Sequence, residues 1–339
     1  MPDYSVYGGC LRSEIPFASL PPGKGAPQWK LRRASGEPIV TDLRALGEDQ
    51  VDAATRVRLF RHAHGFRLVY DDTGVFDVDA SGTRIDWYAG PASPPEAVQL
   101  DVLGRVIPTA MHAAGALCLH GSAVELATGA VAFLAPKRHG KSTLAHALAR
   151  AGARVVTDDV VAIDLEPEPR MRPGVPQLRL MRDAARRLGA SEEAPAGAGG
   201  KIIVEPGEES RTARASLPFS ALYLLRPVRP DTAVESAART PLAGVAAAIS
   251  LLPEARLAPL LGKREASVLL ERAIRLLTTV PVYTLRIARD FDLLDDVVAR
   301  LLVWHGGAPL AGMPAGTAVS SLAATTAVIP APRASVAWE

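Results

Sequence analysis

The sequence predicts a mixed α/β fold of the α+β type, in which a β-rich N-terminal domain precedes a domain built around a strand–loop–helix unit. Two observations lead to this prediction. Residues 55–91 alternate apolar and polar side chains and contain the turn sequences DTG at 72–74 and ASG at 80–82, as antiparallel hairpins do. Further along, the apolar stretch AVAFLA leads through a charged turn into KSTLAHALARAG, which has the composition of a helix.

Length and composition set the outer limits. The 339 residues are enough for about two domains. Apolar residues make up 48% of the chain and the formal net charge is only +2, so neither a nucleic acid nor a membrane is expected as a partner. The two cysteines, Cys10 and Cys118, exclude a disulfide framework. The first residues carry no secretion-signal pattern, and the apolar run at 242–252 is too short to cross a bilayer, which predicts a cytoplasmic protein.

Prolines and composition divide the chain. The sequence PASPPEA at 91–97 is interpreted as a linker, because clustered prolines fit neither a helix nor a central strand. We therefore expect an N-terminal domain over 1–96 and a second domain over 97–305. Residues 306–339 are mostly Ala, Gly, Pro, Ser and Thr. They are predicted to be disordered, because they can bury too little apolar surface to offset the loss of chain entropy.

The second domain begins with a helical apolar pattern over 97–116. The strands LCLHGSAVEL and GAVAFLA follow, joined at Thr128-Gly129. A helix is predicted over 141–151, where Gly152 closes it. The sequence RVVTDDVVAIDL then predicts β structure again.

The rest of the second domain has a looser pattern. Residues 171–200 mix Pro, Gly, Arg and Ala and are predicted to be irregular, with a short helix near 182–188. The sequence FSALYLLRPV predicts a strand, and a helical apolar stripe covers 262–280. A strand VPVYTLRIA and a helix over 292–305, N-capped near Asp290, complete the domain.

The charged turn carries most of the chemical information. It reads A-P-K-R-H-G-K-S-T, whereas a full phosphate-binding loop is G-x-x-x-x-G-K-[ST], so Ala135 stands at the first glycine place. The preceding strand and following helix are the context that such a loop needs, although a charged surface turn is the alternative. In this interpretation Lys141 bridges the outer phosphates and Ser142 binds Mg²⁺. The predicted nucleotide-binding residues are Ala135, Pro136, Lys137, Arg138, His139, Gly140, Lys141, Ser142 and Thr143.

Two carboxylates follow where a metal ligand or proton acceptor is expected. Asp158 and Asp159 lie in RVVTDDVVAIDL, and both can reach one nucleotide only if the strand bends there, since neighbouring side chains of a regular strand point to opposite faces. A hairpin turn at this pair is the alternative. His120 ends an apolar stretch and, taken by itself, fits a hydrogen-bonded strand end as well as a catalytic role.

The order of these motifs resembles that of HPr kinase/phosphorylase. The matching residues are His120-Gly121-Ser122, Gly140-Lys141-Ser142 and Asp158-Asp159-Val160. The chain is more similar still to HPr-kinase-like proteins encoded with lasso-peptide biosynthesis enzymes, in YSVYGGCLRSEIPF, PGVPQLRL and VPVYTLRIARD. The motif core spans about 119–165, with weaker likeness over 1–305. The resemblance implies a kinase fold related to phosphoenolpyruvate carboxykinase, with ATP and Mg²⁺ as cofactors.

The resemblance also implies residue roles. Asp158 would be the base that accepts the acceptor hydroxyl's proton, Asp159 with Ser142 would hold Mg²⁺, and His120 would line the γ-phosphate and acceptor site. The chain departs from the family at Ala135 and Arg138, which stand at usual glycine places. The Arg- and Gly-containing segment associated with phosphorolysis is not recognisable, so a kinase without the reverse reaction is expected.

The leading hypothesis is therefore an ATP- and Mg²⁺-dependent kinase that acts on a serine hydroxyl of a peptide, with a lasso-type precursor as the first choice. A small carrier protein or a small molecule is an alternative acceptor, and a nucleotide-sensing module without turnover is a different class of function. A homo-oligomer is left open. Arg179 and Lys201 are further candidates for contacts with phosphate or peptide.

Overall fold

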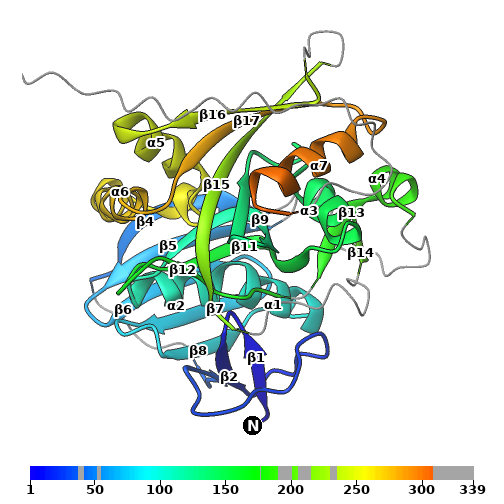
Figure 1. Ribbon diagram of the computed structural model, residues 1–339. Helices are drawn as coiled ribbons and strands as arrows, with labels where there is room; N and C mark the ends of the chain where they lie inside the picture. The colour runs from blue at the N-terminus through cyan, green and yellow to red at the C-terminus, as the bar shows by residue number, and fades with distance from the viewer. Residues whose placement is uncertain are drawn as a thin grey trace, which may run out of the picture.

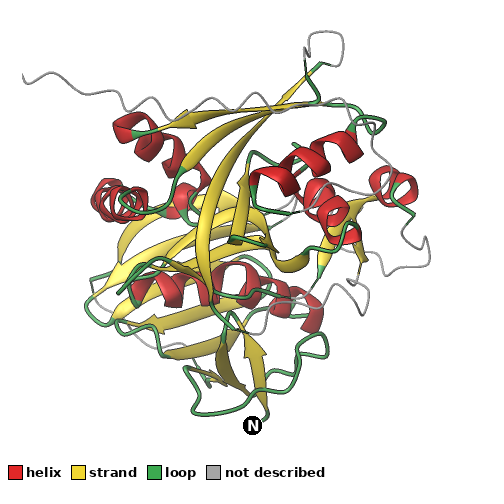
Figure 2. Ribbon diagram, viewed as in Figure 1, coloured by secondary structure: helices red, strands yellow, loops and turns green. Residues whose placement is uncertain are grey.

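Two large β-sheets, with helices packed against them, form the molecule in a computed structural model (Figure 1; Figure 2). The structure describes residues 1–36, 42–51, 55–175, 177–189, 201–204, 215–229 and 235–307. The two sheets confirm the predicted mixed α/β class and the β-rich N-terminal region.

The N-terminal sheet has eight strands in the order β1-β2-β3-β8-β7-β6-β5-β4. Its pairs are antiparallel except β2–β3 and β3–β8, which are parallel. Both predicted turns join neighbouring antiparallel strands and are confirmed. The strands are β1 Asp3–Val6, β2 Gly9–Ser13, β3 Trp29–Arg33, β4 Arg44–Gln50, β5 Arg56–His62, β6 Gly65–Tyr70, β7 Gly74–Asp79 and β8 Arg84–Ala89.

A helical segment follows this sheet and packs into its core. It consists of α1 (Pro95–Asp101), a π-helical turn (Val102–Val106) and α2 (Ile107–Ala113), whose apolar side chains join those of β1–β8 in one buried cluster. The linker interpretation is wrong for Pro95, because this proline occupies the first helical position, where no N–H is needed. The domain boundary between residues 96 and 97 stays a prediction.

The second sheet has seven strands in the order β10-β9-β11-β12-β15-β17-β16. β15 also pairs with β10, in parallel, so that strands β10, β9, β11, β12 and β15 form a closed circuit. A separate hairpin is made by β13 (Leu178–Met181) and β14 (Lys201–Val204). The strands of the second sheet are β9 Leu117–Leu126, β10 Gly129–Leu134, β11 Arg154–Asp164, β12 Arg170–Met171, β15 Leu217–Val228, β16 Ala237–Leu242 and β17 Val282–Ala288.

Helices cover both faces of the second sheet. Along β10, Ala132 and Leu134 pack with residues of α5 and α6, while Val131 and Phe133 pack with residues of α3 and α7. Burial on both faces explains why this strand reads as a continuous apolar run. In Figure 1, α5 and α6 lie to the left of β15, and α3 and α7 to its right. The helices are α3 Lys141–Arg150, α4 Arg182–Arg187, α5 Gly244–Leu251, α6 Lys263–Leu277 and α7 Leu294–Trp304, with 3₁₀ turns at Leu252–Glu254 and Ala258–Leu260.

Most of the predicted elements of the second domain are confirmed, with two corrections. The predicted cap at Asp290 is wrong, since α7 begins at Leu294 and Asp290 instead accepts the amide of Asp292 in the turn before it. Residues 171–200 contain strand β13, because this segment finds a distant partner in β14. Of the predicted disordered tail at 306–339, residues 308–339 lie outside the described residues.

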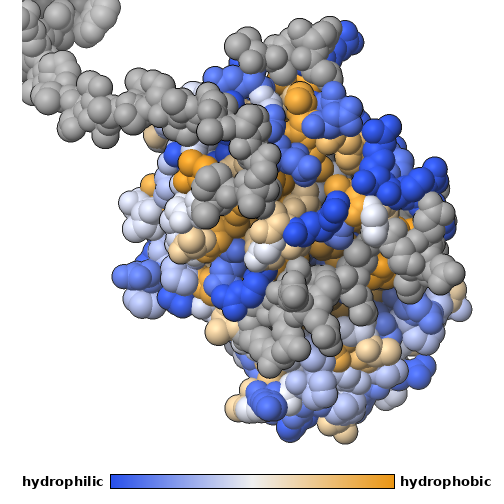
Figure 3. Space-filling model, turned by 45° about the vertical axis from the view of Figure 1, so that its right-hand side comes forward, coloured by the Kyte–Doolittle hydropathy of each residue, from blue (hydrophilic) through white to orange (hydrophobic). Residues whose placement is uncertain are grey.

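The surface carries both hydrophilic and hydrophobic side chains. On the face shown in Figure 3, hydrophilic residues lie beside smaller apolar patches. Among the described residues, no helix is long and apolar enough to cross a membrane.

Gly121 sits where two strands of the second sheet come too close for a side chain. A Cβ atom at this position would lie 2.7 Å from the carbonyl oxygen of Phe133 and 2.5 Å from a methyl carbon of Leu134. Gly121→Ala is therefore expected to destabilise the fold by about 1–3 kcal/mol, the usual cost of overpacking. Urea unfolding would measure the loss, and an unchanged midpoint would show that the strands can separate without cost.

Candidate active site

The predicted phosphate-binding loop joins strand β10 to helix α3. β10 ends at Leu134 and α3 begins at Lys141, with Gly140 at the N-cap in a left-handed conformation (φ 88°). Among the described residues, no side-chain oxygen accepts a hydrogen bond from the first N–H groups of the helix. These groups and the positive end of the helix dipole are suited to an anion.

The two departures from a glycine-rich loop have different structural consequences. Ala135 is fully buried in the apolar cluster under α3 and has no positive φ, so glycine is not required there. Arg138 does adopt a positive φ of 68°, a conformation that favours glycine. The loop therefore keeps its turn at Arg138 at some cost in backbone strain, and exposes a positive side chain.

Lys141 lies inside the loop. Its side chain is buried, and Nζ donates hydrogen bonds to the carbonyl oxygens of Ala135 (2.7 Å) and Pro136 (3.2 Å). The lysine thus ties the first turn of α3 to the end of β10. A buried ammonium held by carbonyl dipoles is positioned to exchange one of them for a phosphate oxygen.

Asp158 connects the loop to the neighbouring strands. Its Oδ1 accepts hydrogen bonds from Ser142 Oγ on α3 (2.9 Å) and Ser122 Oγ on β9 (2.5 Å). Its Oδ2 accepts the backbone N–H of Arg179 (2.9 Å). Ser122 stands opposite Asp158 in the β9–β11 pairing. Ser142, the predicted metal ligand, is therefore in direct contact with a carboxylate.

Strand β11 is irregular at Asp158 and Asp159, as it would have to be for both carboxylates to reach one nucleotide. β11 is a single strand, so the hairpin alternative is wrong. Its pairing with β9 shifts register between Val155 and Thr157, and Asp159 has a left-handed φ of 82°. Thr157 Oγ1 donates to the carbonyl oxygen of Val160 and closes the irregular turn. The register shift and the left-handed Asp159 together interrupt the regular geometry of the strand at the carboxylate pair.

Asp159 has basic partners on both oxygens. His120 Nδ1 lies 3.1 Å from Oδ1, and Arg256 Nη2 lies 3.1 Å from Oδ2. Burial alone would raise the pKa of Asp159, but the positive charge of Arg256 and the hydrogen bond from His120 outweigh it and hold the pKa well below its usual range. Asp159 is therefore ionised at neutral pH.

A distant segment supplies two residues that the sequence analysis missed. Ala255 forms a β-bridge with Leu119, and the Arg256 N–H donates to the carbonyl oxygen of Cys118 (2.9 Å). This attachment fixes the segment beside His120. Glu254, one residue before the bridge, lies within electrostatic range of Lys141 and His120.

Glu254 should make stability depend on pH. Burial outweighs the nearby positive charges and raises its pKa above 4.5, so its contribution to stability is greatest at low pH and is lost as pH rises through the raised pKa. Glu254→Gln is therefore expected to match the wild type below pH 4.5 and to become more stable than it as pH increases. Thermal unfolding from pH 4 to 8 would show this widening gap, and a gap that narrows with pH would contradict it.

The predicted residues differ in where the structure places them. Ser142, Asp158, Asp159 and His120 form the contacts described above, next to Lys141. Lys137, Arg138, His139 and Pro136 are exposed on the loop, and Thr143 is half-buried in the first turn of α3. Arg179 contributes its backbone N–H to Asp158, and its charge helps to lower the pKa of Asp159. The side chain of Lys201 lies outside the described residues.

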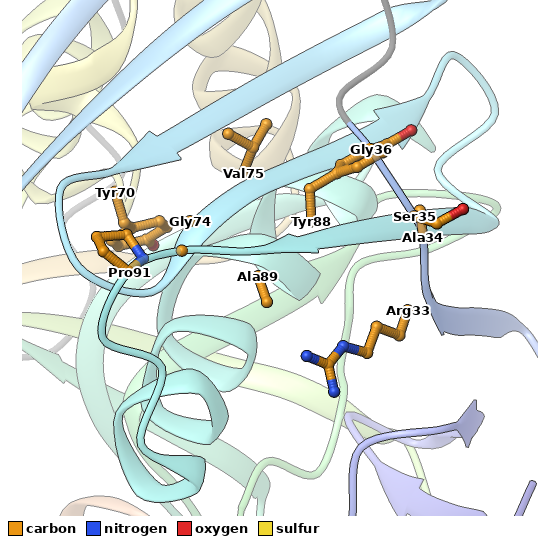
Figure 4. A pocket seen from close by; sticks show the side chains of 11 residues that line it. Arg33, Ala34, Ser35, Gly36, Tyr70, Gly74, Val75, Tyr88, Ala89 and Pro91 are labelled. Carbon is orange, nitrogen blue, oxygen red and sulfur yellow. The ribbon is translucent and has the colours of Figure 1, made fainter.

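The hollows on the described surface include two whose lining can be compared with the predicted site. One of about 240 Å³ is lined by His139, Pro227, Val228, Arg229 and Arg289, beside the loop and at the carboxyl ends of the parallel strands β15 and β17. Ligands of α/β sheets commonly bind at such strand ends. The other, of about 720 Å³, lies on the N-terminal sheet near Arg33 and Tyr88 (Figure 4), and no predicted site residue is among the described residues that line it.

No protein-family model matches the chain, and no curated protein matches it either. Among solved structures, the chain is similar to the Hpr(Ser) kinase/phosphatase from Coxiella burnetii, with 14% sequence identity and a TM-score of 0.31. The match covers 56% of this chain and 95% of that one.

Proposed function

We propose that this protein is an ATP- and Mg²⁺-dependent kinase that phosphorylates a serine hydroxyl of a peptide. The observation that carries the proposal is the position of Asp158, whose carboxylate accepts hydrogen bonds from Ser142 of the loop helix and Ser122 of strand β9. A phosphate-binding loop, a carboxylate in contact with its serine and a second carboxylate that can receive the acceptor's proton are parts that recur in phosphoryl-transfer enzymes.

The loop suits the triphosphate of ATP. The N-terminus of the ten-residue helix α3 faces it, and Lys141 supplies a buried positive charge. Arg229 and Arg289 line the adjoining hollow and add positive charge at the same strand ends. Neutralising the phosphate charge in this way is the main contribution that a protein makes to phosphoryl transfer.

Magnesium suits the oxygen atoms of Ser142 and Asp158. These two side chains are in contact, and hard cations prefer hydroxyl and carboxylate ligands. Bound Mg²⁺ would neutralise charge on the phosphates. We therefore assign Asp158 to the metal, the reverse of the role that the family resemblance implies.

Asp159 and His120 then serve the acceptor side. Asp159 is ionised, and the serine hydroxyl, which is neutral at pH 7, needs a group that receives its proton. In the proposed step the serine oxygen bonds to the γ-phosphorus, the bond from that phosphorus to the β–γ bridging oxygen breaks, and the proton passes to Asp159. The contact with His120 orients the accepting carboxylate.

The choice of a peptide acceptor is supported by the resemblance of YSVYGGCLRSEIPF, PGVPQLRL and VPVYTLRIARD to lasso-associated kinase homologues. Incubation with γ-labelled ATP, Mg²⁺ and a panel of serine-ended precursor peptides would test it. Label on at least one peptide is expected. If Mg-ATP binds but no peptide is labelled, the peptide assignment fails.

The same experiment separates an enzyme from a nucleotide sensor. A sensor would be stabilised against heat by Mg-ATP and would consume no ATP with or without acceptor. ATP consumption that increases when acceptor is added supports the kinase. Small carrier proteins and small hydroxyl compounds, tested in parallel, would reveal the alternative acceptors.

A further inference from the structure

Arg256 connects the carboxylate pair to the helical segment that packs on the N-terminal sheet. Its side chain is 12% exposed, Nη2 contacts Asp159 Oδ2 at 3.1 Å, and Nε donates to the carbonyl oxygen of Gly104 at 2.7 Å. A Cβ atom at Gly104 would lie 3.2 Å from Arg256 Nη2, so glycine lets the guanidinium come close. The arginine is thus held at both ends of its planar group.

The carbonyl of Gly104 is available because of a proline four residues later. In an α-helix this oxygen would accept the N–H of residue 108, but Pro108 has none. The π-helical turn also directs the Ile107 N–H to Val102 instead of Leu103. Two neighbouring carbonyl oxygens, at 103 and 104, are thereby left to side-chain donors.

The N-terminal hairpin uses the other of these oxygens. Tyr7, at the turn between β1 and β2, donates its hydroxyl to the carbonyl oxygen of Leu103 at 2.7 Å. Burial raises the pKa of Tyr7, and the negative charge of Asp159 raises it further. The tyrosine therefore lies within electrostatic range of that carboxylate. The same π-helical turn therefore binds the N-terminal hairpin on one carbonyl and Arg256 on the next.

We propose that Arg256 is a positioning residue for phosphoryl transfer: it holds Asp159 in the orientation that accepts the serine proton, and the carbonyl of Gly104 holds Arg256. The inference rests on the proposed kinase function. It makes the N-terminal part of the chain a structural component of the active site and not only a neighbouring domain.

Arg172 provides a matched control. It also joins strand β11 to the N-terminal part, through Asp164 on one side and the Tyr7 carbonyl and Gln28 on the other, and it is similarly shielded from solvent. None of its contacts reaches Asp158 or Asp159. A purely structural role predicts that Arg256→Gln and Arg172→Gln behave alike.

The first measurement is kcat and the KM for ATP in phosphorylation of a serine peptide. Arg256→Gln is expected to lower kcat by about 100-fold, the usual scale for a misplaced reacting group, while the KM for ATP changes little. Arg172→Gln should leave kcat near that of the wild type. Equal losses of kcat in the two variants would overturn the proposal.

A second measurement needs no catalysis and separates failure of this proposal from failure of the kinase function. Urea unfolding of Arg256→Gln, Asp159→Asn and the double variant forms a double-mutant cycle. Coupled residues should give a double variant that loses less stability than the two single losses together. Additive losses would overturn the contact between Arg256 and Asp159, whereas coupling without any phosphate transfer in the wild type would overturn the kinase function alone.

Discussion

Replacing Lys141 with alanine is expected to reduce phosphate transfer by at least about 100-fold, the scale of losing one preorganised charge or donor from a transition state. The ammonium group is buried and donates hydrogen bonds to loop carbonyls, so its removal leaves the phosphate charge uncompensated in a place shielded from water. Nucleotide affinity should fall as well. Transfer of label from γ-labelled ATP and the thermal shift caused by Mg-ATP would measure the two effects.

Two further variants distinguish a site effect from a general one. Lys30→Ala removes an exposed lysine from the N-terminal sheet and should leave both measurements unchanged. Ala135→Gly should retain transfer, since glycine can adopt any conformation that alanine has there, although loss of a buried methyl group should lower stability slightly. Near-normal turnover in Lys141→Ala would show that residues 135–143 are a charged turn without a catalytic role.

The second large effect concerns Asp158. Asp158→Asn is expected to raise the Mg²⁺ concentration needed for half-maximal activity by about 10- to 100-fold, the range for losing a group that orients a metal site. The reason is its contact with Ser142, since a neutral amide oxygen holds a hard cation less well than a carboxylate. A magnesium titration at saturating ATP would measure the shift.

Asp159→Asn is expected to have a different effect. It should lower the rate of transfer by ~100- to 10,000-fold, the usual contribution of a general base, with little change in magnesium dependence. If instead Asp159→Asn shifts the magnesium dependence and Asp158→Asn does not, the roles implied by the family resemblance are correct and the division proposed from the contacts is wrong. If neither variant loses transfer, the carboxylate pair is structural.

Local patterns explain why much of the site could be predicted. The burial of β10 on both faces produces its apolar run, and the helix that starts at Lys141 follows a glycine with the conformation such a loop needs. The requirement that the strand bend at Asp158-Asp159 follows from the alternation of side chains, and the positive φ of Asp159 meets it. These features depend on residues close together in the sequence.

The residues that were missed depend on long-range contacts. Ser122 is an ordinary strand serine until the β9–β11 register places it opposite Asp158. Glu254 and Arg256 reach the site through the bridge between Ala255 and Leu119, and no local pattern indicates that pairing. A usable signal did exist for the π-helical turn, since a proline four residues after Gly104 must leave that carbonyl without its helical donor.

The closed circuit of strands also affects how copies of this chain can meet. An unpaired strand edge is a template on which another chain can add a strand, and β16 is the terminal strand in the order of the second sheet, as far as that sheet is described. Pro241 lacks the N–H that an added strand would need, and Arg239 places a charge on the same short strand. Edge-to-edge aggregation is therefore disfavoured here, and an oligomer would have to form through another surface.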